Sequence, residues 1–141
     1  MKRQHLFVAG KAIIESEGKI LLLEEDSRDP DHTNAGMWDL PGGRIKFGEH
    51  PLDGLSREVR EECGLEVKIA EPIYVDHWLP QPYDDEEWQI VGIFYKCQLV
   101  GGELHLSQEH KAFKWIGLNK LKDYQILPSS RKALEIYKNL A

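Results

Sequence analysis

One segment, residues 51–63, constrains the fold of this chain more than any other. Pro51 suits the first position of a helix, and Gly64 suits the left-handed residue that follows a helix end. The apolar residues of the segment are Leu52, Leu55, Val59 and Cys63. Because they recur every three or four positions, they predict an amphipathic helix over residues 51–63 that packs one face against a core.

The segments on either side of this helix have the composition of β-strands and turns. The expected strands cover residues 6–14, 19–23, 37–40, 65–79, 88–100 and 112–116. Glu17-Gly18 predicts a hairpin turn, Pro41-Gly42-Gly43 is expected to stop a strand, and residues 26–36 and 81–87 are expected to be loops.

A second helix is expected at the C-terminal end, capped by Ser129 or Ser130. Its inward-facing residues are expected to be Ala133, Ile136, Tyr137 and Leu140. Some of the expected strands follow one another through hairpins, and others are separated by a helix. The prediction is therefore an α/β (α+β) fold in which helices pack on the faces of a mixed sheet.

Length and composition are those of one globular domain over residues 1–141. Of the 141 residues, 41% are hydrophobic and 30% are charged, and the net charge of -6 argues against binding duplex nucleic acid. The chain starts without the apolar run of a secretory signal and has no run near the ~20 residues of a membrane span, so a cytoplasmic protein is expected. Cys63 and Cys97 could form a disulfide, but their apolar neighbours favour buried, reduced thiols.

Three carboxylates share one side of the predicted helix. Glu58, Glu61 and Glu62 are three and four residues apart, and like charges at this spacing repel by about a few tenths of a kcal/mol per pair. A solvated acidic face is the simplest interpretation. Two residues favour a binding site instead. Gly54 leaves room for a ligand or metal, with a tight helix contact as the alternative, and Arg57 can hold the carboxylate of Glu61.

Carboxylates grouped in this way suit a hard divalent cation, so magnesium is expected, with manganese possible. Magnesium keeps several water ligands and is commonly completed by substrate phosphates. The sequence therefore predicts a phosphorylated substrate.

Residues 43–65 read GRIKFGEHPLDGLSREVREECGL. The segment resembles the Nudix box, G-x5-E-x7-R-E-U-x-E-E-x-G-U with U aliphatic. The matching positions are Gly43, Glu49, Arg57, Glu58, Val59, Glu61, Glu62, Gly64 and Leu65. A match at every fixed position is specific, and the preceding residues 38–42 also resemble the usual entry into this box. The chain is thus similar to Nudix hydrolases, which implies their α/β/α sandwich.

The resemblance implies roles for individual residues. Those that resemble metal ligands are Glu49, Glu58, Glu61, Glu62 and, in a loop outside the box, Glu109. Arg57 resembles the arginine that orients the carboxylates, and the general base is expected to be Glu62, Glu49 or Glu109. Glu109 could instead be a solvated loop carboxylate, and His110 beside it is expected to be a bystander.

The sequence indicates less clearly which residues bind the substrate. Many family members carry a basic residue after the first hairpin, whereas this chain has Glu24-Glu25 there, so Arg28, Arg44 or Lys46 is expected to contact phosphate instead. The aromatic residues that could stack on a nucleobase are Trp38, Trp78, Tyr83 and Trp88, although a place in the core is the simpler interpretation for each.

The reaction implied is metal-dependent hydrolysis of a diphosphate bond in a nucleoside triphosphate or a nucleoside diphosphate-linked compound, with a monophosphate product. The alternative from another class is a Nudix-fold sensor that binds a nucleotide without hydrolysis. Such sensors usually lose box glutamates and carry a second domain, whereas every box residue is present here. The expected partner is a small nucleotide-like molecule rather than a membrane or nucleic acid, and the protein is expected to be a monomer or homodimer.

Overall fold

The computed structural model describes residues 1–25, 36–108 and 110–140. Its strands are β1 (Arg3–Ser16), β2 (Lys19–Glu25), β3 (Trp38–Asp39), β4 (Gly42–Arg44), β5 (Leu65–Trp78), β6 (Glu86–Gly102) and β7 (His110–Gly117). Its helices are α1 (Pro51–Cys63), the short 3-10 helix η1 (Leu118–Asp123) and α2 (Pro128–Leu140). The predicted bounds of α1 are confirmed, as are the left-handed Gly64 (φ 73°) and the turn at Glu17-Gly18.

The strands form one mixed sheet in the order β3-β2-β1-β6-β5, with β4 paired to β1 and β7 paired to β2. The long β1–β6 pair is parallel, and the other named strand pairs in the described part of the chain are antiparallel. The mixed sheet predicted from the sequence is therefore confirmed.

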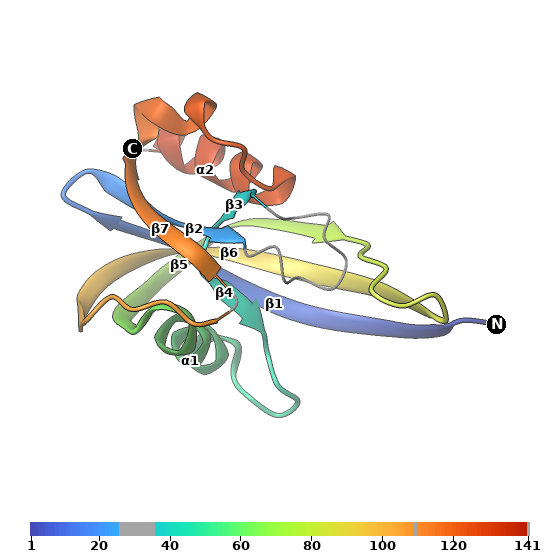
Figure 1. Cartoon of the computed structure of the whole chain (residues 1–141). Helices are drawn as coiled ribbons and strands as arrows, with labels where there is room; N and C mark the ends of the chain where they lie inside the picture. Colours follow the sequence, from blue (N-terminus) through green and yellow to red (C-terminus); the bar gives the residue numbers. More distant parts are fainter. Residues whose placement is uncertain (26–35, 109, 141) are drawn as a thin grey trace.

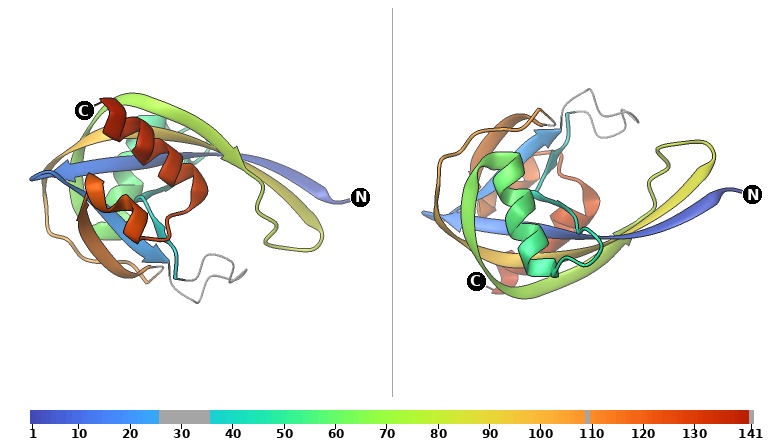
Figure 2. Two further views of the ribbon diagram at one scale, coloured as in Figure 1. Left: turned by 90° about the horizontal axis from the view of Figure 1, so that it is seen from above. Right: turned by 90° about the horizontal axis from the view of Figure 1, so that it is seen from below.

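The two long helices cover opposite faces of this curled sheet, as predicted for an α/β/α sandwich (Figures 1 and 2). Successive strand residues point to opposite faces. Ile13 and Phe94 accordingly pack in the cluster that contains Leu134 of α2, whereas Ile14 packs in the cluster that contains Leu55 of α1. The start of β1, with the strand segments beside it, extends beyond both helices as an arm (Figure 2).

The expected stop at Pro41-Gly42-Gly43 is confirmed for β3, which ends at Asp39, but Gly42 also begins a further strand, β4, that was not expected and that pairs with β1. Gly42 has φ 148°, and a side chain there would collide with the carbonyl oxygen of Gly10. Two expectations about α2 are wrong. Helix α2 begins at Pro128, so Ser129 and Ser130 lie in its first turn and do not cap it. Leu140 is 67% exposed because it lies at the last position of α2.

The two cysteines are buried and free, which confirms the expectation of reduced thiols. Burial raises the pKa of Cys63 to about 11 and that of Cys97 to about 12. None of the helices in the described ranges is both long enough and apolar enough to cross a membrane.

Candidate functional site

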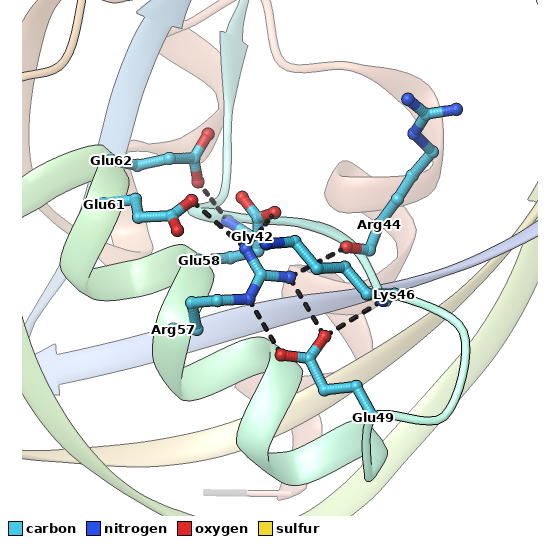
Figure 3. A network of polar contacts seen from close by, with 8 residues as sticks. All are labelled: Gly42, Arg44, Lys46, Glu49, Arg57, Glu58, Glu61 and Glu62. Carbon is cyan, nitrogen blue, oxygen red and sulfur yellow. Dashed lines mark hydrogen bonds and ion pairs between the residues drawn. The ribbon is translucent and has the colours of Figure 1, made fainter.

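Helix α1 carries its glutamates beside its buried stripe, and Glu62 is itself buried. The helix starts where the His50 side chain accepts a hydrogen bond from the Leu52 amide (3.1 Å), and it ends where the Gly64 amide donates to the Arg60 carbonyl (2.9 Å). Leu55 and Val59 are fully buried against the sheet. This burial fixes the rotation of the helix, so its glutamates face β4 and the loop that follows it (Figure 3).

Arg57 lies at the centre of these carboxylates (Figure 3). Its Nε and Nη2 donate to the two oxygens of Glu49 at 2.8 and 3.0 Å. Its Nη1 donates to Glu58 Oε1 (3.0 Å) and to Glu61 Oε2 (3.1 Å), and Nη2 also reaches the Arg44 carbonyl (3.3 Å). These bonds raise the pKa of Arg57 further above its usual value, so one permanent positive charge holds three carboxylates in place.

Two glycines make room for this arrangement. A side chain at Gly54 would come within 2.8 Å of Glu49 Oε1, and one at Gly43 would collide with the carboxylate of Glu58. The space left by the mid-helix glycine is therefore filled by Glu49, not by an approaching ligand. The Lys46 amide also donates to Glu49 (2.9 Å), and hydrogen bonds from Arg57 and Lys46 lower the Glu49 pKa to about 2.

Glu62 is the buried carboxylate of the helix, with an exposed fraction of 8%. The Gly42 amide donates to its Oε1 at 2.6 Å, and Nε2 of His110 lies 3.6 Å from its Oε2. Burial raises the Glu62 pKa to about 8, although the charge of Lys11 and the Gly42 amide act in the opposite direction. The described residues therefore do not stabilise the charged form of Glu62 enough to offset the cost of its burial.

His110 is also buried, and the structure places it against Glu62, although the sequence suggested no role for it. Among the described residues, its Nδ1 has no hydrogen-bond partner. Burial, followed by the charge of Lys11, lowers its pKa, so the ring is neutral at pH 7. A neutral imidazole adds no positive charge beside Glu62.

A divalent cation fits the chemistry of this side of the protein. Glu58 and Glu61 of α1 and Glu49, which precedes the helix, surround Arg57. Glu62 of α1 adds a fourth carboxyl group, and oxygen ligands are those that magnesium prefers. In the ranges that the structure describes, no three acidic, histidine or cysteine side chains already surround a common point. The fit therefore rests on the type of ligand and on the excess negative charge.

A cleft of about 680 Å³ lies between the sheet and the first turns of α2. Residues that line it include Lys11 on β1, Gly43 and Arg44 on β4, Trp78 on β5 and Lys132 on α2. Gly43 is also the residue against which the Glu58 carboxylate packs. The cleft and the carboxylates of α1 thus meet at β4.

Of the four aromatic candidates, Trp78 lines this cleft. Its indole lies over Gly92, where any side chain would come within 2.5 Å of the ring. Trp38 packs edge-on against Tyr124 with ring centroids 5.7 Å apart and is outside the cleft lining. Trp88 likewise has aromatic partners, because its ring contacts Phe7 at 4.8 Å and Tyr83 at 6.4 Å. Only Trp78 of this set is thus placed to contact a bound molecule in the cleft.

The basic candidates occupy different positions. The Arg44 guanidinium lies 4.2 Å from the Phe7 ring and 4.9 Å from the Trp88 ring, at the edge of the cleft and pointing away from the carboxylates (Figure 3). Lys46 is exposed and is not among the residues that line the cleft. Two further predicted residues, Arg28 and Glu109, lie outside the described residues.

The structure also contains an ion pair between Lys11 and Asp39 that the sequence did not predict. Lys11 Nζ donates to Asp39 Oδ2 at 2.7 Å, and Ser130 Oγ donates to Asp39 Oδ1. The nearby charges of Asp39 and Glu62 raise the Lys11 pKa despite the opposing effect of burial. The signal in the sequence was a single lysine within the apolar residues 6–14.

Comparisons with known proteins find one domain family over nearly the whole chain. The model of the NUDIX domain matches residues 5–137. The nucleoside triphosphatase NudI of Escherichia fergusonii is 28% identical over 88% of this chain and 91% of that protein. The ADP-ribose pyrophosphatase of Methanocaldococcus jannaschii is 31% identical over 83% of this chain, and a MutT-like protein of Streptomyces ambofaciens is 30% identical over 77%. This chain spans only 65% and 61% of the lengths of these last two relatives.

The fold is also found among solved structures. The crystal structure of a MutT protein from Methanosarcina mazei Go1 superposes with a TM-score of 0.80 and 27% identity. The superposition covers 99% of this chain and 96% of that one. The similarity therefore extends over both helices and the whole sheet.

Proposed function

This chain belongs to the Nudix family of hydrolases, and from that premise we propose that it hydrolyses a diphosphate bond in a nucleoside triphosphate or a nucleoside diphosphate-linked compound, with Mg²⁺ or Mn²⁺ as cofactor. The observation that carries the proposal is at Gly43. This residue lines a cleft large enough for a nucleotide, and its missing side chain makes room for the Glu58 carboxylate. A substrate in the cleft would thus lie next to the acidic side of α1.

The ligands we propose for the cation are Glu58, Glu61 and Glu62, with Glu49 and Glu109 assisting. When bound, the cation would neutralise charge on phosphate oxygens and lower the pKa of a bound water. Arg57 would keep the carboxylates in place through bonds it already makes to Glu49, Glu58 and Glu61.

The proton of the attacking water needs an acceptor. Both oxygens of Glu49 already accept hydrogen bonds, from Arg57 and from the Lys46 amide. Among the described residues, Oε2 of Glu62 accepts no such hydrogen bond, and Nε2 of His110 lies 3.6 Å from it. We therefore favour Glu62 over Glu49 as this acceptor, with Glu109 as the candidate outside the described residues.

The nucleotide would be held on the cleft side of the sheet. We propose that the Trp78 indole stacks on the base, since base–aromatic stacking contributes about 1–3 kcal/mol. Arg44, held by Phe7 and Trp88, would meet a phosphate. The printed names of two relatives, a nucleoside triphosphatase and an ADP-ribose pyrophosphatase, support a substrate of either kind.

A hydrolysis screen tests this function. The purified protein is incubated with nucleoside triphosphates, nucleotide sugars, ADP-ribose and dinucleoside polyphosphates in the presence of Mg²⁺, and the products are separated by chromatography. We expect at least one of these classes to yield a nucleoside monophosphate or a sugar phosphate. Binding of a nucleotide without any product in the whole screen would contradict the proposal and support the sensor alternative.

A further inference from the structure

The proposed mechanism assigns no role to the positive charge of Lys11. Its side chain is 13% exposed and lines the cleft from β1, one strand away from Gly43. A buried ammonium group is unfavourable unless acceptors surround it. The acceptors among the described residues are Asp39 Oδ2 at 2.7 Å and the Leu40 carbonyl at 3.4 Å. Of its three N–H groups, these two acceptors use two.

The position of this ammonium group is fixed by Asp39. Oδ1 of Asp39 accepts hydrogen bonds from the Leu40 amide (2.8 Å) and from the Ser130 hydroxyl, so its Oδ2 is directed to Lys11. Because Ser130 belongs to α2, the pair links β1, β3 and the helix that forms one side of the cleft. A cation held in this way needs little reorganisation to bind an anion.

Lys11 also lies between the cleft and the acidic side of α1. It pairs with Gly42 across the β1–β4 ladder, and the Gly42 amide donates to Glu62. Among the described residues, the cations that line the cleft are Lys11, Arg44 and Lys132, and of these Arg44 and Lys132 are exposed to solvent. Water screens an exposed charge more strongly than a buried one. A phosphate in the cleft would therefore interact most strongly with Lys11.

We propose that Lys11 is a substrate-binding residue that donates a hydrogen bond to a phosphate oxygen of the substrate. The proposal rests on the proposed function and adds a contact to it: the diphosphate lies over β1 at Lys11 as well as beside α1. A purely structural role, in which Lys11 only neutralises Asp39, would leave substrate affinity independent of this lysine.

The test compares Lys11→Met, Lys11→Arg and the double variant Lys11→Met with Asp39→Asn. The single Lys11→Met variant leaves Asp39 buried without its counter-charge and can lose stability for that reason alone. In the double variant the side-chain amide introduced at position 39 still offers an oxygen to the Leu40 amide and Ser130, so the charge pair is removed while the fold keeps those bonds. Lys96→Met, on an exposed position of β6 away from the cleft lining, is the matched control.

Two readouts are measured. Binding of α,β-methylene-ADP, a non-hydrolysable diphosphate, is followed by titration calorimetry in metal-free buffer, and KM and kcat are measured with the best substrate of the screen. We expect the double variant to weaken binding and raise KM by roughly 10-fold or more, as for loss of a charged hydrogen bond. Lys11→Arg should recover part of the affinity, and Lys96→Met should behave as wild type.

A double variant that folds and retains the affinity and KM of wild type would overturn the role of Lys11 while leaving the proposed function intact. A wild-type protein that neither binds the analogue nor hydrolyses any compound of the screen would overturn both. The two failures are therefore distinguishable.

Discussion

Two cations organise the carboxylates of this protein, and they do so in different ways. Arg57 binds residues one, four and eight positions away in the sequence, and the side chains of these partners are 19% (Glu49 and Glu58) to 57% (Glu61) exposed. Lys11 binds Asp39, which is 28 positions away and has a side chain only 7% exposed. We call the first group the Arg57 network and the second the Lys11–Asp39 pair. When one partner is lost, water can hydrate the groups that remain in the network, but it cannot easily hydrate the group that remains in the buried pair. The pair should therefore matter more for folding than the network does.

The largest expected effect is on stability, from Lys11→Met alone. Removing one partner of a buried ion pair costs about 3–5 kcal/mol, and the slight exposure of Lys11 favours the lower end of that range. The double variant with Asp39→Asn should regain most of this loss, because no unpaired charge remains. Denaturant unfolding in chelator measures both. A single variant as stable as wild type would remove the distinction between the two groups.

The next largest effect is on catalysis, from Glu62→Gln. The variant keeps Oε1, which accepts from the Gly42 amide, but it loses the charge and the proposed proton acceptor. We expect turnover to fall on the order of 10²-fold or more. The melting temperature in chelator should be unchanged or slightly higher. Early melting with normal turnover would identify Glu62 as a structural residue.

The pH dependence of stability also tests the effect of burying Glu62. Burial raises the Glu62 pKa from 4.5 to about 8, so the native state binds this proton more tightly than the unfolded state does. This contribution to stability is full below pH 4.5 and is lost as the pH rises through about 8. Melts of the metal-free protein from pH 5 to 8 should therefore show a decline that is reduced in Glu62→Gln. Equal slopes in both proteins would contradict this assignment.

Glu109→Gln tests the candidate outside the described residues. If Glu109 is a ligand or proton acceptor, the change should lower turnover strongly while substrate affinity stays within roughly a few-fold, because size is preserved. Steady-state kinetics with the best substrate give both values. Normal turnover would return the role of base to the residues of the box.

The smallest expected effect on stability is that of Arg57→Met. The carboxylates that Arg57 binds are 19–57% exposed, so water can hydrate them when Arg57 is lost, and unfolding in chelator should change by about 1 kcal/mol or less. Turnover should fall by roughly 10-fold, because Glu49, Glu58 and Glu61 lose the group that positions them. A stability loss as large as that of Lys11→Met would show that the Arg57 network is also part of the core.

The difference between the Arg57 network and the Lys11–Asp39 pair also explains which features the sequence could predict. The bounds of α1 and the grouping of Glu58, Glu61 and Glu62 follow from helical periodicity, which is a local property. The Lys11–Asp39 pair depends on how β1, β3 and α2 meet, and no local pattern encodes that meeting. Strand β4 was missed for a related reason: Gly42 and Gly43 indicate a turn by propensity, but they are needed for close packing against Gly10 and Glu58.

The first turn of α2 gives a second example. Serine before a helix favours a capping role, which was the prediction for Ser129 and Ser130. In the structure Ser129 donates to Asp76 at 2.9 Å and Ser130 donates to Asp39, so both bind carboxylates from strands far away in the sequence. Tertiary partners therefore decided what local propensity could not.

The central claim is that hydrolysis depends on a divalent cation held by the carboxylates of α1. The most direct test measures nucleotide hydrolysis by the metal-free protein in excess chelator, with metal removal confirmed by elemental analysis, and again after Mg²⁺ is restored in excess over the chelator. We expect activity to be lost and then recovered on addition of Mg²⁺. Activity that is unchanged in the chelator would contradict the claim.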